Sequence, residues 1–361
     1  MALQRELLWC DGSAHTNMIG MDSFVDGHGY LAACTAGLPT RGTLAAMRAD
    51  LDEWGTGGSS PIRYGDLVEA GRALFAQIVG VDASRVATGS QTSVMTAVVA
   101  SSLPDGAEVL VPERDFSSIV FPFLAQAHRG IRVRSVPLAS LATAVTPDTA
   151  LVAWSAVQSA TGAVAENDAV VAAARAVGAR TLCDLTQAAG ILPISAAPFD
   201  VTVTHAYKWL CAPRGVAFMT VSAATQEWLR PVQAGWYAGE DVWSSCYGPA
   251  MRLADDARRF DVSPAWQAWP GAVAALRHVA SLDMDTVWRH GTGLADRLAA
   301  RLGVAGQSQA VMTVPDPSGA GLAALTAAGI TASGRAGRLR LAFHHWNDES
   351  DVDAVAAVLG R

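Results

Sequence analysis

The feature that most constrains this 361-residue chain is an alternation of strand and helix patterns between about residues 67 and 221. Short runs rich in β-branched residues are separated by Ala-rich amphipathic stretches such as Asp168–Val177. Strands spaced by helices are typical of α/β proteins with a mostly parallel, buried sheet. Seven strands are expected, over Arg85–Ala87, Glu108–Pro112, Ile131–Pro137, Ala150–Val157, Arg180–Asp184, Asp200–His205 and Gly215–Val221.

The pattern changes after about residue 250, and the change predicts a second, smaller unit. Long helical patterns over Trp266–Ser281 and Thr286–Leu302 precede a short α/β segment with a strand at Arg338–Phe343 and a helix at Glu349–Leu359. The first forty residues carry few helix signals. We therefore expect an N-terminal arm (1–40) that packs on the small domain, a large domain (41–250) and a small C-terminal α/β domain (251–361).

Composition argues against several classes of protein. Hydrophobic residues make up 51% of the chain and charged residues 16%, which is typical of a well-buried globular protein. A net charge of −7 without a basic cluster argues against a nucleic-acid partner. No apolar run reaches the roughly 18 residues that span a bilayer, so no membrane association is expected. The N-terminus does not resemble a secretory signal, and the expected location is cytoplasmic.

Cysteine and histidine spacing does not predict a metal site. The five cysteines are scattered and show no C-x-x-C pair, as expected for small buried side chains in a reducing cytoplasm. His344 and His345 are adjacent, but no carboxylate or cysteine stands at ligand spacing beside them.

One lysine, Lys208, is retained among 26 basic residues, and the other 25 are arginines. Arginine does not readily lose its proton and does not form a Schiff base with an aldehyde. A single retained lysine therefore indicates chemistry that needs a primary amine. The alternative is an arginine-rich codon bias with one accidental survivor.

Asp184 ends a predicted strand, and Lys208 follows the end of the next one. A buried carboxylate at a strand end needs a cationic partner, for which a protonated pyridine nitrogen is suitable. A lysine on the adjacent strand can reach the aldehyde of the same ring. This order, Asp-x-x-Gln and then a lysine about 25 residues on, resembles the pyridoxal-phosphate (PLP) enzymes of fold type I. Specifically, it resembles the class V aminotransferase family with its cysteine desulfurase and kynureninase relatives, from Tyr30 to Asn347.

The resemblance implies a role for each of these three residues. Lys208 would hold the cofactor as an internal aldimine and later move the substrate's α-proton. Asp184 would pair with the pyridinium nitrogen and keep the ring an electron sink. Gln187 would hydrogen-bond the phenolic oxygen of the ring. Their ordinary structural alternatives are a capping aspartate, a surface glutamine and a solvated lysine.

The segment Thr88–Ser93 follows a strand and opens a helix, where hydroxyls and free backbone N–H groups form an anion site. The family places its phosphate contacts here, which makes Ser90, Gln91 and Thr92 candidates. His205 matches a family phosphate contact that is commonly Ser or Cys. Tyr207 matches the tyrosine before the lysine in kynureninase-like members, with a buried core tyrosine as the alternative.

Two further segments match family positions around the ring. Phe116 aligns with the aromatic residue that stacks on the cofactor, with ordinary core as the alternative. The turn that begins Gln158-Ser159 resembles a Ser/Asn-x-Thr-Gly turn whose polar residue contacts the ring oxygen. Either Gln158 or Ser159 fits that role.

The C-terminal third implies a substrate contact and a dimer. Arg340 matches the family arginine that grips the substrate α-carboxylate with a bidentate fork, with Arg338 and Arg335 as lesser candidates. Ser263 and Trp266 lie in the region from which family dimers reach across to the partner's phosphate. We therefore expect a homodimer with the active site at the subunit interface.

The resemblance does not decide among three reactions. The last cysteine, Cys246, lies too close to Lys208 for a desulfurase with a mobile C-terminal cysteine. A β-elimination of the C–S lyase type on a cysteine-derived substrate, through an external aldimine and a quinonoid, is preferred over transamination to a keto acid and over epimerisation. The aromatic residues Trp54, Trp236, Tyr237 and Trp243 are candidates for a pocket that takes a bulky side chain, with ordinary core as the alternative.

Two other classes of protein share the expected sheet. A nucleotide-binding oxidoreductase would show G-x-G-x-x-G after a strand, and no strand here is followed by one. A catalytically silent scaffold on the same fold would be expected to lose Lys208 or Asp184, and both are present.

Overall fold

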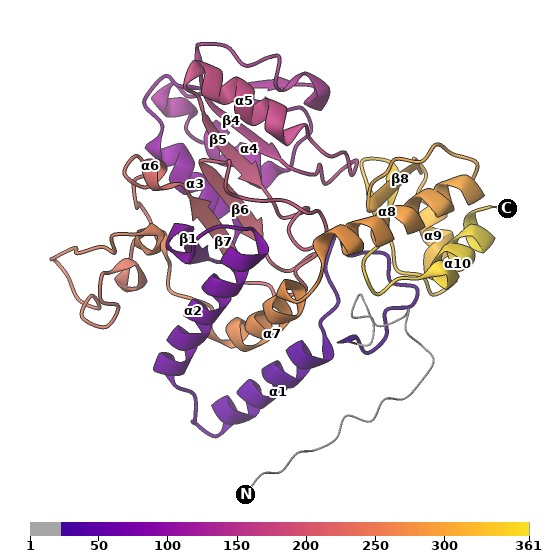
Figure 1. Ribbon diagram of the computed structural model, residues 1–361, viewed down its shortest axis with the longest axis horizontal. Helices are drawn as coiled ribbons and strands as arrows, with labels where there is room; N and C mark the ends of the chain where they lie inside the picture. The colour runs from indigo at the N-terminus through magenta and orange to yellow at the C-terminus, as the bar shows by residue number, and fades with distance from the viewer. Residues whose placement is uncertain (1–22, 361) are drawn as a thin grey trace, which may run out of the picture.

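The computed structural model describes residues 23–360 and shows a large α/β part joined to a smaller part (Figure 1). Seven strands form the main sheet in the order β1-β7-β6-β5-β4-β2-β3. They are β1 (Val86–Gly89), β2 (Glu108–Pro112), β3 (Arg132–Val136), β4 (Thr149–Ser155), β5 (Arg180–Asp184), β6 (Val201–His205) and β7 (Ala217–Val221).

Five neighbouring strands, from β6 to the edge strand β3, are parallel, and β7 alone runs against its neighbours. The pairs β3–β2, β2–β4, β4–β5 and β5–β6 are parallel, whereas β7 pairs antiparallel with both β6 and β1. The expected α/β fold with a mostly parallel seven-stranded sheet is confirmed.

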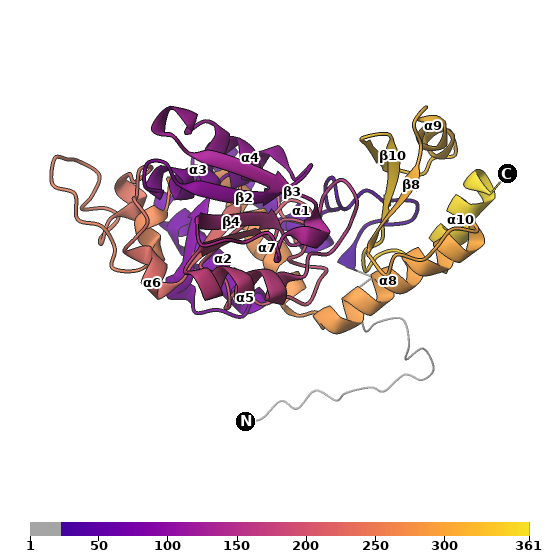
Figure 2. The same cartoon turned by 90° about the horizontal axis from the view of Figure 1, so that it is seen from above.

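Helices cover both faces of the sheet (Figure 2), so the inner strands are buried on each side, whereas the edge strand β3 is partly exposed. In β4, Val152 and Trp154 point into one apolar core while Leu151 and Ala153 point into the other. Packing on both faces explains why these strands appear in the sequence as continuous apolar runs. The helices of the large part are α1 (Arg41–Gly55), α2 (Pro61–Ile78), α3 (Thr92–Ser102), α4 (Ser117–Leu124), α5 (Asn167–Val177), α6 (Ala223–Gln226) and α7 (Trp269–Ala280).

The smaller part is a three-stranded antiparallel sheet in the order β8-β10-β9, packed against helices. Its elements are α8 (Met284–Arg301), β8 (Val311–Pro315), α9 (Ala320–Ala327), β9 (Ser333–Arg335), β10 (Arg338–Ala342) and α10 (Glu349–Leu359). Single bridges join Tyr30 to Thr331 and Ala32 to Ala342, and Leu31 is buried in the core of this part. The described end of the N-terminal arm therefore lies against the small sheet.

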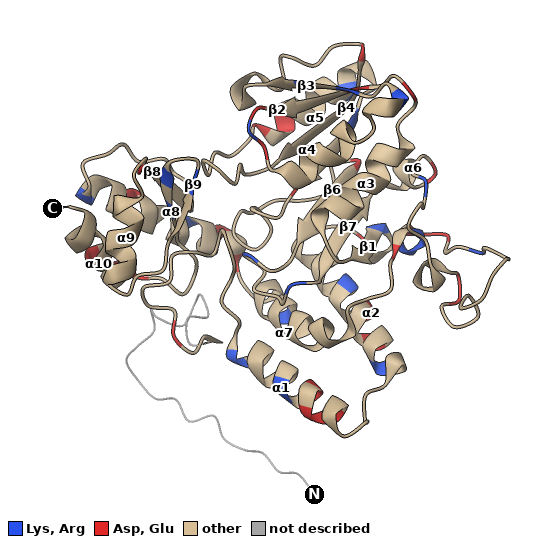
Figure 3. Ribbon diagram, turned by 180° about the vertical axis from the view of Figure 1, so that it is seen from behind, with Lys and Arg blue, Asp and Glu red and all other residues tan. Residues whose placement is uncertain are grey.

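The helix α7 packs on α1 and α2, so a segment beyond residue 250 belongs spatially to the large part. The expected division of the chain at residues 40 and 250 stays a prediction. Basic and acidic residues are interspersed over the described ribbon (Figure 3). No described helix has the length and apolar character needed to cross a membrane.

Candidate active site

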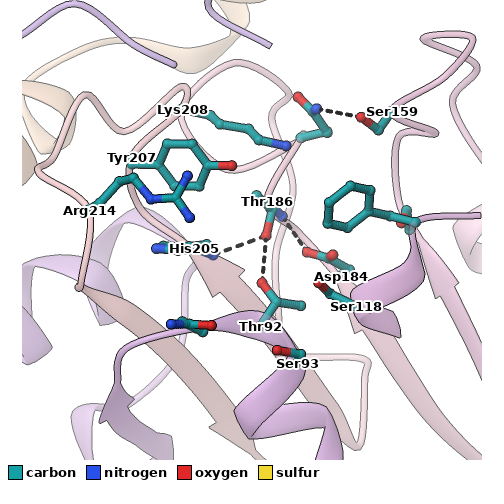
Figure 4. Close-up of a pocket in the computed structure, with 14 residues that line it drawn as sticks. Thr92, Ser93, Ser118, Ser159, Asp184, Thr186, His205, Tyr207, Lys208 and Arg214 are labelled. Atoms are coloured by element: carbon teal, nitrogen blue, oxygen red, sulfur yellow. Dashed lines mark hydrogen bonds between the residues drawn. The ribbon is translucent and has the colours of Figure 1, made fainter. Parts of the chain in front are cut away.

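A cavity of about 110 Å³ lies at the carboxyl ends of the central strands, which is where α/β sheets hold their ligands (Figure 4). The loops after β2, β4, β5 and β6 reach it, together with the first turn of α3. Its wall consists of Gln91, Thr92, Ser93, Phe116, Ser118, Ser155, Ser159, Asp184, Thr186, Gln187, His205, Tyr207, Lys208 and Arg214.

Lys208 extends into this cavity from the turn that follows β6 (Figure 4). The side chain is only 5% exposed, and its Nζ lies 5.4 Å from the centroid of the Phe116 ring. Burial lowers the pKa of the amine to about 8, against the opposing effect of the Asp184 carboxylate. A larger share of this amine is therefore uncharged near neutral pH than in an exposed lysine.

The turn that carries Lys208 is held by a close backbone approach from the arm. The N–H of Gly37 donates to the carbonyl oxygen of Tyr207 at 2.9 Å. A Cβ at position 37 would lie 2.0 Å from the carbonyl oxygen of Lys208, so only glycine fits there.

Gln187 joins three segments around the cavity. Its amide nitrogen donates to the carbonyl oxygen of Cys34 at 2.9 Å and to Ser159 Oγ at 3.1 Å. Its amide oxygen accepts from the indole N–H of Trp209 at 2.8 Å. The arm, the turn after β4 and the lysine-bearing turn are thus connected through one side chain.

Asp184 lies at the end of β5, next to β6, and is almost fully buried. One carboxylate oxygen accepts from the backbone N–H of Thr186 at 2.8 Å. Burial raises the pKa of Asp184 to about 6, although Thr186 and the nearby Lys208 cation oppose that rise. A cation placed against this carboxylate would lower its pKa again.

The opposite end of the cavity is built to accept an anion. The helix α3 begins at Thr92, and Gln91 makes no side-chain capping bond, so the first backbone N–H groups are free to bind a ligand. The Nε2 atom of His205 is buried and has no hydrogen-bond partner within residues 23–360. Burial, with Arg214 and Lys208 nearby, lowers the pKa of His205 to about 4, so its ring is neutral.

Phe116 forms the side of the cavity that faces Lys208 and is 43% exposed. The preceding residue, Asp115, fixes this segment. Its carboxylate accepts from the N–H of Phe116 at 2.7 Å, from Ser155 Oγ at 2.6 Å and from the N–H of Ser155 at 2.9 Å. The aromatic ring is therefore tied to the end of β4.

Arg340 lies immediately behind the Ser159 wall and is 1% exposed. Its Nη1 donates to the carbonyl oxygen of Ser159 at 2.5 Å and to Ser159 Oγ at 3.2 Å, and its Nη2 donates to Thr35 Oγ1 at 3.0 Å. Its Nε has no partner in the described chain, and every acceptor that it contacts there is neutral. A buried guanidinium without a carboxylate favours binding of an anion.

Nine of the residues expected from the sequence line the cavity, namely Gln91, Thr92, Phe116, Ser159, Asp184, Gln187, His205, Tyr207 and Lys208. Ser159 faces the cavity, whereas the amide of Gln158 is buried and bonded to Glu113 and Thr161. Ser90 is half-buried and Ser263 exposed, and Trp266 stacks on Tyr64 with ring centroids 5.5 Å apart. None of these last four lies on the wall, and their roles stay predictions.

The four aromatic residues expected to form a side-chain pocket do not line the cavity, so that prediction is wrong for this wall. Trp54 and Trp243 are exposed, and Trp236 packs against Trp243 and Tyr237. Ser93 and Thr186 lie in segments expected at the site but were given no role, and sequence reasoning missed Ser118, Ser155 and Arg214. Thr186 was recognisable, because it stands between two predicted site residues at a strand end. Its hydroxyl accepts from the N–H of His205 at 3.0 Å.

The family model for class V aminotransferases matches residues 62–342, and the chain belongs to that family. Its members are PLP-dependent enzymes that act on amino acids, so this protein is a PLP-dependent enzyme.

Individual relatives are more distant. Isopenicillin N epimerase from Streptomyces clavuligerus is 28% identical over 228 residues, which is 56% of this chain and 56% of the epimerase. Kynureninase from Deinococcus radiodurans is 28% identical over 62% of this chain and 56% of its own length. The chain thus matches little more than half the length of these relatives.

Solved structures confirm the fold of PLP enzymes of type I. The cystine C–S lyase C-DES, in complex with cysteine persulfide, has a TM-score of 0.82 at 20% identity, over 92% of this chain and 97% of the lyase. A C-DES variant with glycine covalently linked to the PLP cofactor has a TM-score of 0.84 at 20% identity, over 97% and 99%. The cysteine desulfurase CsdA from Escherichia coli has a TM-score of 0.80 at 19% identity, over 94% and 95%.

The residues of this cavity fit PLP. An uncapped helix terminus and an unpartnered imidazole suit a phosphate, a buried carboxylate suits a protonated pyridine nitrogen, and a buried amine suits an aldehyde. These groups come from separate strands and meet in one place, as the family membership requires.

Proposed function

We propose that this enzyme catalyses a β-elimination of the C–S lyase type on a cysteine-derived amino acid. The observation that carries the proposal is the presence near one another of a buried, partly deprotonated amine at Lys208 and a buried guanidinium at Arg340, whose acceptors within residues 23–360 are all neutral. An amino-acid substrate supplies the missing carboxylate, and elimination begins when a base removes its α-proton.

The cofactor is held at both ends in this proposal. Lys208 binds its aldehyde carbon covalently, Asp184 pairs with the ring nitrogen, and Phe116 stacks on the ring. Bound PLP withdraws electron density from the substrate's Cα and so weakens the bonds to that carbon. The phosphate is received by Ser90, Gln91, Thr92 and His205, while Ser159, Gln158, Gln187 and Tyr207 surround the ring.

The substrate is oriented by Arg340 in this proposal. A planar guanidinium grips a carboxylate through two parallel hydrogen bonds, which fixes the direction of the α-C–H bond. The substrate's amine would displace Lys208 from the aldehyde carbon and so free the lysine amine. Lys208 would then take the α-proton, because it is the one amine on the wall and the pKa of about 8 of the free amine suits proton transfer near neutral pH.

Elimination needs few further groups, which favours it over desulfuration. A thiolate leaves without help from a strong acid, since the pKa of a thiol is about 8.5. Desulfuration needs a thiol that receives sulfur. Among the described cysteines, Cys34, Cys183 and Cys211 are buried, Cys246 is exposed, and none lines the cavity.

Epimerisation is the second candidate, favoured by the likeness to isopenicillin N epimerase. Transamination is the third, in keeping with the family. We also propose a cytoplasmic homodimer with the active site at the subunit interface, in which Ser263 and Trp266 reach the partner's cofactor phosphate.

Incubation with a panel of S-substituted cysteines separates the three reactions. Release of pyruvate, ammonia and a thiol establishes elimination. Conversion of the cofactor to its pyridoxamine form establishes transamination, and uptake of solvent deuterium at Cα with the amino acid otherwise intact establishes epimerisation. Asp184→Asn is the matched control, because it preserves side-chain size while removing the charge expected at the ring nitrogen. Absence of pyruvate across the panel would refute the lyase assignment.

A further inference from the structure

A second pocket of about 420 Å³, here called the side pocket, adjoins the active-site cavity. It lies between the arm, the first half of α1 and the segment after Lys208. Its wall consists of Thr35, Ala36, Gly37, Pro39, Thr43, Leu44, Met47, Tyr207, Cys211, Ala212, Pro213 and Arg214. Most of these side chains are apolar, and no carboxylate is among them.

Two connections join the side pocket to the active site. Tyr207 and Arg214 line both spaces, with the Arg214 guanidinium 4.5 Å from the centroid of the Tyr207 ring. Thr35 lines the side pocket and accepts a hydrogen bond from Arg340 Nη2 at 3.0 Å. The side pocket therefore borders both the cofactor cavity and the arginine assigned to the substrate carboxylate.

We propose that the side pocket binds the side chain of the substrate, and that the substrate is an amino acid with an uncharged, apolar substituent of several carbon atoms. The inference rests on the proposed function, because it assumes a substrate amine at Lys208 and a carboxylate at Arg340. We place the Cβ substituent beside Thr35 and Tyr207, because Thr35 contacts Arg340 and Tyr207 lines both the cavity and the side pocket.

The chemistry of the wall selects such a substituent. Pro39, Leu44 and Met47 offer apolar surface on one side, and Ala212 and Pro213 offer it on the other. An apolar chain leaves water on entering, whereas a cationic side chain finds no carboxylate on this wall to replace its hydration. An anionic side chain could pair with Arg214, but that guanidinium is exposed and stacked against the Tyr207 ring, and an exposed ion pair contributes little. Leu44 and Met47 are the specificity-determining residues in this assignment.

Binding of linear amino acids without a leaving group tests the pocket directly. Alanine, 2-aminobutyrate, norvaline and norleucine are titrated into the PLP-loaded enzyme, and dissociation constants are read from the cofactor's absorbance. Each added methylene is expected to tighten binding about fourfold in the wild-type enzyme. Glutamate, similar in length to norvaline but charged, is expected to bind more weakly than norvaline.

Leu44→Trp fills the side pocket and should flatten the series, so that norleucine binds no better than alanine. Leu44→Ala enlarges the pocket by a milder change and should move the best fit to a longer chain. Leu51→Trp, at an exposed position of the same helix outside the pocket, is the matched control and should retain the wild-type series. Equal series in wild type and both Leu44 variants, or glutamate binding as tightly as norvaline, would overturn the assignment.

The binding series and the reaction panel fail independently. These ligands carry no Cβ leaving group, so their affinities do not depend on elimination. If affinity rises with chain length but S-substituted cysteines release no pyruvate, the lyase assignment is refuted and the side-chain role of the side pocket is supported. If affinity is independent of chain length but pyruvate is released, the lyase assignment is supported and the side-chain role of the side pocket is refuted.

Discussion

The amine of Lys208 lies 5.4 Å from the centre of the Phe116 ring, and the Asp184 carboxylate belongs to the same wall. The lysine and the ring come from different strands of the sheet and face each other across the cavity. Lys208 would hold the aldehyde of a planar cofactor placed between them, and Phe116 would stack on its ring. Four measurements on this arrangement follow from its geometry and charges.

Borohydride reduction of the PLP-loaded protein should fix one cofactor per chain, at Lys208. Because the chain has one lysine, peptide mass spectrometry locates the attachment without ambiguity. Lys208→Ala should lose the visible absorbance of the bound cofactor and about three orders of magnitude or more in turnover. Lys208→Arg keeps the positive charge and serves as the control. Retained absorbance in either variant would contradict the covalent role.

Cofactor capture by the apoenzyme should depend on pH with a midpoint near 8. The pKa of Lys208 is lowered from 10.5 to about 8 by burial, and only the uncharged amine attacks an aldehyde. The rate should rise about tenfold per pH unit below the midpoint and level off above it. Stopped-flow absorbance between pH 6 and 10 measures this profile.

Asp184→Asn tests the cause of that midpoint. The carboxylate of Asp184 raises the pKa of Lys208, so its removal should move the midpoint of capture to lower pH. A midpoint that stays near the ordinary lysine value in wild type would show that the amine is hydrated rather than buried.

Arg340→Ala should raise KM for amino acids by about 100-fold, the equivalent of roughly 3 kcal/mol for lost charge-assisted hydrogen bonds. The corresponding primary amines, which lack the carboxylate, should bind wild type and variant equally. Arg340→Lys tests whether the fork geometry matters beyond the charge. The carboxylate role would be lost if amines and amino acids weakened in parallel.

Buried histidines should make the fold sensitive to mild acid. His344 Nε2 contacts the carbonyl oxygen of Trp209 at 2.9 Å, and His278 Nε2 contacts His345 Nε2 at 3.0 Å. Burial lowers the pKa of His344 from 6.5 to about 3, and that of His345 well below its usual range. Below pH 6.5 these histidines therefore bind protons in the unfolded chain but not in the folded one, and the free energy of unfolding falls as pH drops from 6.5 toward 3.

The expected loss between pH 7.5 and 5.5 is on the order of 1 kcal/mol for each of His344 and His345. Denaturant unfolding at the two values measures it. His344→Gln should lower the stability at pH 7.5 and weaken the pH dependence. His128→Gln, at an exposed histidine, should leave both unchanged. A pH-independent free energy of unfolding in wild type would refute the account.

Sequence reasoning predicted those parts of the molecule that local pattern determines. The seven strands lie within a few residues of their expected bounds. Strands such as β2, β4 and β7 are buried on both sheet faces and therefore apolar over most of their length, whereas the edge strand β3 is partly exposed. Asp184 and Lys208 were expected to meet, since the carboxyl ends of adjacent strands share one edge of the sheet.

Contacts between distant segments were beyond local pattern. In the sequence Asp115 resembles any loop aspartate, and its contact with Ser155 depends on the position of β4. Thr35 contacts Arg340, which is remote in the sequence. The helical pattern near Trp266 gave no sign that α7 would pack on α1 and α2. Residue type alone does not tell an exposed tryptophan from a buried one. The expectation that Trp54 and Trp243 line the cavity was wrong for this reason.

The burial of a solitary lysine also determines how this protein can be handled on the bench. Dyes and resins that couple to lysine side chains find none on its surface, since the one lysine is 5% exposed. Maleimide chemistry at Cys246, the exposed one among the described cysteines, is the side-chain route for attaching a probe while the Lys208 amine stays untouched.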